Sequence, residues 1–197
     1  MDSFPAFFPL AGRRVVIVGS SDQAEGKAKL FDGSPAELVR LDDGRAFDPA
    51  SYRGAALAFI AGEDEAFAKL AARAARDAGV PVNVVDRPEL CDFFTPALVD
   101  RGQVVAAVGT GGASPVLAQV LKERIEAAAP EGVGRVAALL QQFREETRAA
   151  FPDLGERRAF VLGVLNGAPA TAAAAGDMDT ARTLMRQALK SAQGRAR

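Results

Sequence analysis

The feature that most constrains the fold is a regular alternation of short apolar runs with helical segments up to Asp86. Val15-Val16-Ile17-Val18 is an unbroken run of β-branched residues, which is typical of a strand buried on both faces of a parallel sheet. Further strands are expected at 37–41, 55–61 and 80–86. A short helix with a Ser or Asp cap is expected at 20–31, and a second helix over 63–78, where apolar residues recur at helical spacing. This order predicts a doubly wound α/β fold with parallel strands.

The pattern changes after Asp86. Residues 96–108 contain two apolar runs on either side of Asp100-Arg101-Gly102-Gln103, which predicts a β-hairpin. A helix is expected from Pro115, and every element expected after about residue 129 is a helix. We therefore expect a Rossmann-like dinucleotide-binding domain at 1–92, a hairpin-and-helix segment at 93–128 and a helical domain at 129–197.

Composition excludes several kinds of catalysis and binding. The chain has no histidine and one cysteine, which removes Ser-His-Asp catalysis, zinc sites built on histidine and an internal disulfide. Acid-base chemistry therefore depends on Asp, Glu, Lys, Tyr52 or Cys91. A net charge of −1 argues against a general nucleic-acid binder. Neither a signal peptide nor an apolar run of membrane-spanning length is evident, so we expect a cytoplasmic protein.

A dinucleotide-binding turn is expected after the first strand. Residues 19–24, Gly-Ser-Ser-Asp-Gln-Ala, keep the first glycine of the Gly-x-Gly-x-x-Gly/Ala pattern and an accepted alanine at its end, with serine in the middle. Asp42 follows Gly19 by 23 residues, close to the usual spacing of the acidic residue that binds a ribose. An ordinary strand-to-helix turn is the alternative. The predicted NAD-binding residues here are Gly19, Ser20, Ser21, Ala24 and Asp42.

Three blocks further along the chain carry a resemblance to a known family. They are Val82-Asn83-Val84-Val85-Asp86, the stretch 93–102, and Gly111-Gly112-Ala113-Ser114-Pro115-Val116-Leu117-Ala118. In this order they closely resemble the precorrin-2 dehydrogenase/sirohydrochlorin ferrochelatase module of siroheme synthesis. Phe4-Pro5 and Gly155-Glu156-Arg157-Arg158 also fit that family, so the resemblance covers nearly the whole chain.

The resemblance implies a homodimeric enzyme with an NAD-binding domain, a dimerisation segment at 93–128 and a helical tetrapyrrole-side domain at 129–197. Its activity would be NAD-dependent oxidation of precorrin-2 to sirohydrochlorin, and bifunctional members also insert Fe²⁺ to give siroheme. The family's catalytic aspartate matches Asp86, and its serine beside the tetrapyrrole matches Ser114. No cluster of His or Cys predicts a resident metal site, so iron would be a substrate.

The local sequence around each matched residue also predicts a role for it, independently of the resemblance. A carboxylate at the carboxyl end of a strand can accept protons from the macrocycle, although Asp86 could instead cap the turn that follows. Asn83 is expected to hold the cofactor or to fix the loop. Ser114 before Pro115 predicts a helix N-cap, and a glycine-rich loop at a helix start favours anions. The predicted substrate-binding residues are Thr110, Gly111, Gly112 and Ser114.

The departures from the family pattern lie in the NAD half. Ser21 replaces a glycine, the connection 43–54 is short by about one strand, and Ala68 stands where the family usually has asparagine. Two alternatives to the dehydrogenase therefore stay open. One is a chelatase that works without NAD, and the other is a non-catalytic protein that binds tetrapyrrole or serves as a scaffold.

Overall fold

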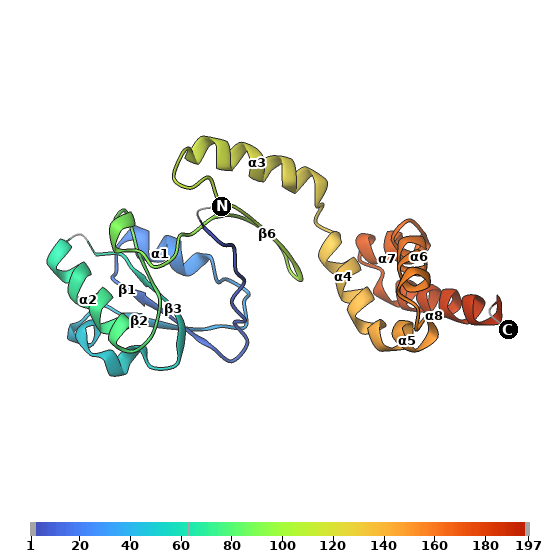
Figure 1. Ribbon diagram of the computed structural model, residues 1–197, viewed down its shortest axis with the longest axis horizontal. Coiled ribbons are helices and arrows are strands. Elements are labelled where there is room, and N and C mark those ends of the chain that lie inside the picture. The colour runs from blue at the N-terminus through green and yellow to red at the C-terminus, as the bar shows by residue number, and fades with distance from the viewer. Residues whose placement is uncertain (1–2, 63, 196–197) are drawn as a thin grey trace. The chain divides into compact units, whose positions relative to one another are not determined.

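The computed structural model describes residues 3–62 and 64–195 and consists of two compact units, Met1–Thr95 and Pro96–Arg197. Each unit has a hydrophobic core of its own, and Figure 1 shows the elements of each. The narrower division predicted at 92/93 and 128/129 stays a prediction.

The first unit is built on a four-stranded parallel sheet, which confirms the α/β prediction. Its strands are β1 (Arg14–Val18), β2 (Glu37–Leu41), β3 (Ala55–Ile60) and β4 (Val82–Val84), in the order β2-β1-β3-β4. From β1 the chain runs to one neighbour, β2, and then crosses to the other, β3. The strand order therefore reverses between β1 and β3, and open α/β sheets bind ligands at the carboxyl ends of strands at such a reversal.

Two helices cover opposite faces of this sheet. The side chains of Val16, Val18 and Ile60 pack in one core with α2 (Glu65–Asp77), and those of Val15 and Ile17 pack in another with α1 (Asp22–Lys29). Successive strand side chains point to opposite faces, so unbroken apolar runs are what such a sheet requires.

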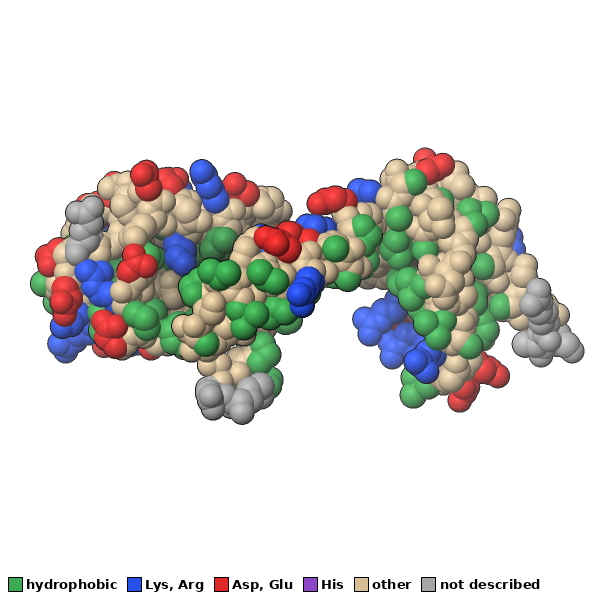
Figure 2. All heavy atoms as spheres, turned by 90° about the horizontal axis from the view of Figure 1, so that it is seen from above, with side chains coloured by type: hydrophobic (Ala, Val, Ile, Leu, Met, Phe, Trp, Pro, Cys, Tyr) green, Lys and Arg blue, Asp and Glu red, His purple; other side chains and the backbone are tan. Residues whose placement is uncertain are grey.

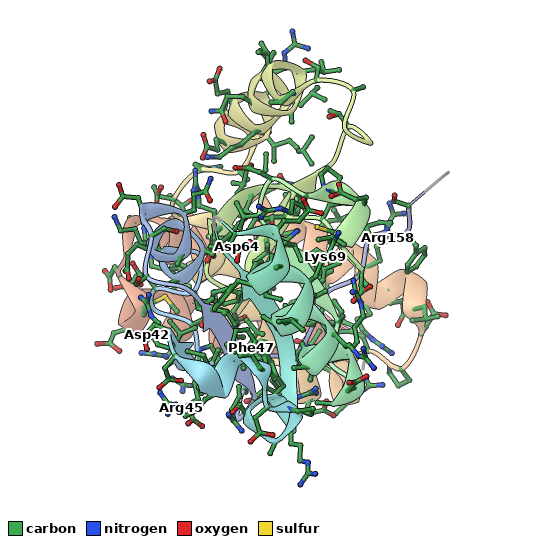
Figure 3. All side chains as sticks on the ribbon, turned by 90° about the vertical axis from the view of Figure 1, so that its left-hand side faces the viewer. Asp42, Arg45, Phe47, Asp64, Lys69 and Arg158 are labelled. Carbon is green, nitrogen blue, oxygen red and sulfur yellow. The ribbon has the colours of Figure 1, made fainter. Side chains whose placement is uncertain are left out.

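The short connection between β2 and β3 forms two 3₁₀ helices, η1 (Gly44–Phe47) and η2 (Pro49–Tyr52). The buried Tyr52 hydroxyl donates to the carbonyl of Ala46 at 2.7 Å, and burial raises the pKa of Tyr52. Phe47 meets Phe67 of α2 edge to face at 5.1 Å between ring centroids, and Figure 3 shows Phe47 beside that helix. Within the described residues, no further strand lies between β2 and β3.

The second unit begins with the predicted hairpin, β5 (Ala97–Arg101) and β6 (Val104–Val108), and continues into α3 (Pro115–Ala128). The Asp100 carboxylate accepts the N–H of Gly102 at 2.7 Å and so stabilises the hairpin turn. Apolar side chains remain exposed on α3, where Figure 2 shows hydrophobic atoms gathered. They are Val116, Leu117 and Val120.

The rest of this unit is helical, as expected, but its helices divide differently from the sequence prediction. The helices are α4 (Val133–Gln142), α5 (Arg144–Ala150), α6 (Leu154–Leu165), α7 (Ala168–Ala175) and α8 (Met178–Arg195). The single helix expected through 136–151 breaks at Phe143, whose side chain is buried in the core. The alanine run 172–175 belongs to α7, which ends at left-handed Gly176.

None of the helices in the described parts of the chain combines the length and the apolar character needed to cross a membrane.

A close contact between α4 and the hairpin yields the first prediction. A Cβ at Gly134 would lie only 1.7 Å from the carbonyl oxygen of Arg101, so Gly134→Ala must push β5 and α4 apart. We expect the free energy of unfolding to fall by about 1–3 kcal/mol, as measured by urea titration of the helical circular dichroism signal. The control Gly163→Ala lies in open space on α6 and should gain up to about 1 kcal/mol. Equal midpoints for the two variants would contradict the contact.

Candidate functional site

The turn after β1 is held in a conformation that requires glycine. Gly19 has φ +106°, and a Cβ on it would lie 2.4 Å from the carbonyl oxygen of Ala61. The N–H of Gly19 donates to Leu41 at 2.8 Å, and the N–H of Ala61 donates to Val18 at 2.9 Å. The predicted dinucleotide-binding turn at residues 19–24, called the fingerprint turn below, is therefore packed between the carboxyl ends of β2 and β3.

Ser21 serves as the N-cap of α1. Its Oγ accepts the N–H of Ala24 and donates to the carbonyl of Ala61, each at 3.4 Å. The Ser21 backbone is extended, at φ −77° and ψ 166°, so its conformation does not require glycine. Ala24 is fully buried at the position where the pattern needs a small residue. The turn, with the positive end of α1 behind it, thus fits an anionic pyrophosphate.

Asp42 and Ser20 are both exposed at the same carboxyl edge of the sheet. Asp42 directly follows β2, while the adjacent Asp43 caps η1 and pairs with Arg45 at 3.0 Å. Figure 3 shows Asp42 and Arg45 on the same side of this unit. Asp42 is thus placed where an acidic residue can accept hydrogen bonds from ribose hydroxyls.

Asp86 is the only non-glycine residue with positive φ, at 59°, in the part of the chain that the structure describes. It lies two residues beyond β4, and the N–H of Val85 donates to the carbonyl of Ile60 at 2.9 Å. Its Oδ2 accepts a hydrogen bond from Nε2 of Gln23, in the first turn of α1, at 2.6 Å. A left-handed aspartate is strained by roughly 1 kcal/mol, and such strain clusters at functional sites.

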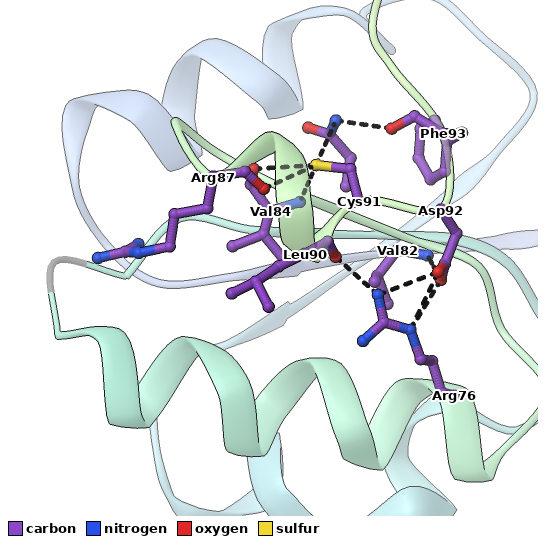
Figure 4. Close-up of polar contacts among 9 residues, drawn as sticks. Arg76, Val82, Val84, Arg87, Leu90, Cys91, Asp92 and Phe93 are labelled. Atoms are coloured by element: carbon purple, nitrogen blue, oxygen red, sulfur yellow. Dashed lines mark hydrogen bonds and ion pairs between the residues drawn. The ribbon is translucent and has the colours of Figure 1, made fainter. Parts of the chain in front are cut away.

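The segment after Asp86 is fixed to the sheet by Cys91 and Asp92, as Figure 4 shows. Sγ of Cys91 accepts the N–H of Val84 at 3.2 Å and lies 3.3 Å from the carbonyl of Arg87, to which it can donate. These contacts hold the 87–91 turn against β4, and burial raises the pKa of the Cys91 thiol. The Asp92 carboxylate accepts bonds from Nε of Arg76 at 3.0 Å and from the N–H of Val82 at 3.0 Å.

Asn83 uses only one end of its buried amide. Nδ2 donates to the carbonyl of Phe93 at 3.0 Å, which fixes the loop. Oδ1 has no hydrogen-bond partner and is the only buried side-chain oxygen or nitrogen of which this holds within the described residues. Asn83 is the register partner of Phe59, so it lies on the face of the sheet that α1 covers. An unpaired buried acceptor costs about 1–3 kcal/mol, so this atom is suited to a ligand donor.

Lys27 stands on α1 one turn after Gln23. Its ammonium donates to Oγ1 of Thr95 at 3.1 Å and lies 5.7 Å from the ring centroid of Phe59. Burial lowers the pKa of Lys27, while attraction to Cys91 and Asp86 opposes that shift. Helix α1 therefore binds both ends of the segment 86–95, through Gln23 and through Lys27.

The glycine-rich loop predicted to bind substrate belongs to the second unit. Oγ of Ser114 accepts the N–H of Leu117 at 3.1 Å, which confirms the N-cap interpretation. Oγ1 of Thr110 donates to the Ser114 carbonyl at 3.2 Å, and Gly111 and Gly112 have φ of 61° and 81°. The structure thus gathers Gly19, Ser20, Ser21, Ala24 and Asp86 at one sheet edge and these four residues in a separate loop.

No group of three or more Cys, Asp or Glu side chains in the described residues is arranged to hold a metal ion.

In the helical region, the Arg157 guanidinium has a structural role, because it donates to the carbonyls of Phe151 at 3.0 Å and Pro152 at 2.9 Å.

Sequence reasoning missed Gln23 and Lys27 as parts of this edge. Gln23 lies at a variable position of the fingerprint and meets Asp86 across 63 residues of chain, so no local pattern signals the pair. Lys27 occupies an ordinary helical position, and its contact with Thr95 depends on the path of the chain after β4.

Two family models match the chain. Residues 6–97 match the model described as "Putative NAD(P)-binding", and residues 132–189 match "Sirohaem synthase dimerisation region". The second match spans most of the helical region, whereas the sequence prediction assigns dimerisation to 93–128.

Individual proteins agree with these matches. "Siroheme synthase" of Azotobacter vinelandii is 36% identical over the whole chain, which covers 46% of that protein. The same-named protein of Methylococcus capsulatus is 37% identical, with 98% of this chain and 44% of that protein covered. The chain therefore spans less than half the length of these relatives.

A solved structure, "SirC, precorrin-2 dehydrogenase", is similar in fold with a TM-score of 0.64 and 17% identity, covering 95% of this chain and all of that one. The sequence matches and the shared fold agree along the chain. This chain belongs to the siroheme synthase family, as a homologue of the N-terminal module that joins an NAD(P)-binding region to a dimerisation region.

Proposed function

We propose that the chain oxidises precorrin-2 to sirohydrochlorin with NAD⁺ as the oxidant. The observation that carries this proposal is Asp86, a carboxylate in a left-handed conformation at the carboxyl edge of the sheet, bound to the helix that opens at the fingerprint turn. The names of the relatives and of the similarly folded SirC support the choice of substrate.

The residues that would hold NAD⁺ lie along one edge of the sheet. Backbone N–H groups of Ser20 and Ser21 and the start of α1 would bind the pyrophosphate, with Gly19 forming the tight turn and Ala24 keeping the helix close to the sheet. Asp42 would bind a ribose, and the unpaired Oδ1 of Asn83 would accept a hydrogen bond from the cofactor. When bound, NAD⁺ supplies the acceptor for the hydride.

Asp86 would be the catalytic base. Forming a double bond in the macrocycle removes one hydride and one proton, and the proton needs an acceptor. The chain has no histidine, so a carboxylate is the natural choice at neutral pH. Thr110, Gly111, Gly112 and Ser114 would bind the substrate, whose carboxylates suit a helix N-terminus.

Insertion of Fe²⁺ into sirohydrochlorin is the second candidate function. Ser21 is the observation that favours it, because this reaction does not need NAD⁺. The Ser21 side chain fills the place of the glycine that lets a cofactor approach, whereas metal insertion needs only a base for the pyrrole protons. In this reaction Fe²⁺ is a substrate held mainly by the macrocycle. Incubation with sirohydrochlorin and Fe²⁺ in the absence of NAD⁺ tests it through the absorbance spectrum of siroheme.

Removing the proposed base should abolish oxidation and spare folding. Asparagine tolerates the left-handed conformation well, so Asp86→Asn should fold normally and bind NAD⁺ with unchanged affinity. We expect the rate of NADH formation from precorrin-2 to fall by roughly 10²–10⁴-fold, the usual contribution of a general base. Asp32→Asn, in an exposed turn, is the control. Unchanged turnover in Asp86→Asn would reject Asp86 as the base.

Removing the proposed ribose ligand should weaken cofactor binding. Asp42→Ala should raise the calorimetric Kd for NAD⁺ by about ten- to a hundredfold, because it deletes a charge-assisted hydrogen bond. The neighbouring Asp43→Ala removes the η1 cap and the Arg45 ion pair, and it should leave this Kd unchanged. Equal effects of the two variants would place the ribose elsewhere.

We also propose that the chain is a homodimer joined through the segment 93–128. Val116, Leu117 and Val120 leave an apolar stripe exposed on α3, which a second copy would cover. The double variant Val116→Glu/Val120→Glu should convert the dimer to monomer in sedimentation analysis. Leu165→Glu, at an apolar residue that is also exposed but lies inside the matched dimerisation region, is the comparison. Dissociation by Leu165→Glu alone would move the interface to 132–189.

A further inference from the structure

We propose that Gln23 positions the catalytic carboxylate, binding Oδ2 of Asp86 and leaving Oδ1 to receive the proton. The inference rests on the proposed function, because it assigns a partner to the proposed base.

The contact itself is short and directional. Nε2 of Gln23 donates to Oδ2 of Asp86 at 2.6 Å, which is near the lower limit for a charge-assisted hydrogen bond. Within the described residues, Oδ1 of Asp86 has no hydrogen bond or ion pair. The two oxygens of this carboxylate are therefore inequivalent, and the free one is the proton acceptor.

Gln23 extends from a helix that is fixed on several sides. Ser21 caps α1, Ala24 and Ala28 are buried against the sheet, and Arg40 of β2 bonds Glu25 at 3.0 Å. The ammonium of Lys27 adds the tie to Thr95 described above. An amide on so rigid an element can restrict the carboxylate to one rotamer, which is how a supporting residue preserves reactive geometry.

The side chain of Asp86 needs such support because its own backbone does little to fix its direction. A left-handed aspartate beyond the last residue of a three-residue strand has few ladder hydrogen bonds to set its direction. Its nearest backbone ties are Val85 to Ile60 at 2.9 Å and Arg87 to Val84 at 3.3 Å. The Gln23 bond then fixes the side chain that these ties do not reach.

The chemistry favours glutamine in this role. An amide N–H orients a carboxylate without bringing a full positive charge to it, so the base is positioned but not neutralised. Because Gln23 belongs to the first turn of the fingerprint helix, the same element would align both the cofactor and the base. The hydride and the proton would then leave the substrate in a fixed relative geometry.

Kinetics of the full-length chain test the assignment. Gln23→Leu removes the donor at similar volume and should lower kcat for precorrin-2 oxidation about tenfold, while the Kd for NAD⁺ stays unchanged. Gln23→Glu replaces the donor with a second carboxylate beside Oδ2 and should lower kcat further at neutral pH. Lys29→Gln changes an exposed residue of the same helix that the proposal does not use, and it should leave kcat unchanged.

A double-mutant cycle separates positioning from a structural effect. Asp86→Gly removes the carboxylate and suits the left-handed backbone, so Gln23→Leu should cause no further loss of kcat in that background. Additive losses, an unchanged kcat in Gln23→Leu, or a weaker Kd for NAD⁺ in that variant would each overturn the inference. If Asp86→Gly alone keeps full activity, Asp86 is not the base. If the unaltered chain forms no NADH from precorrin-2, the proposed function itself fails.

Discussion

The close approach of Gly19 to Ala61 is the constraint on which the site depends. The chain leaves β1 at φ +106° and passes so near the end of β3 that a single added carbon would collide with the Ala61 carbonyl. This contact sets the start of α1 over the carboxyl edge of the sheet. From there Gln23 reaches Asp86, and Lys27 reaches the end of the same segment.

Ser21 shows how such a turn can persist without its middle glycine. Its backbone is extended, so no left-handed residue is needed there, and its hydroxyl satisfies an amide that a helix start otherwise leaves unpaired. The cost would be a Cβ beside the path proposed for the pyrophosphate. Ser21 thus caps α1 but leaves less room for a ligand than glycine would. The affinity for NAD⁺ would show how much the lost room matters.

The connection between β2 and β3 is short, and the packing of its side chains against the sheet and α2 holds the two strands in place. Two 3₁₀ helices place Tyr52 and Ala46 in the core with α2, and the Tyr52 hydroxyl satisfies an adjacent carbonyl. The chain therefore crosses from one side of β1 to the other without an α-helix between β2 and β3. Because β3 still pairs with β1 from Val15 to Val18, the carboxyl edge that holds the site is preserved.

The sequence by itself determined the features that depend on neighbouring residues. The β-branched run of the first strand and the apolar segments that follow it predict the parallel strands, and the cap at Ser114 and the hairpin at 97–108 follow from local backbone preferences. The tertiary structure decided the rest. The helix predicted through 136–151 breaks at Phe143, where the backbone leaves helical geometry at φ −99° and ψ 12° and the side chain packs into the core. Asp86 is left-handed, and its bond to Gln23 joins residues 63 positions apart. No local pattern encodes such contacts, since they form only when the sheet brings its carboxyl ends together.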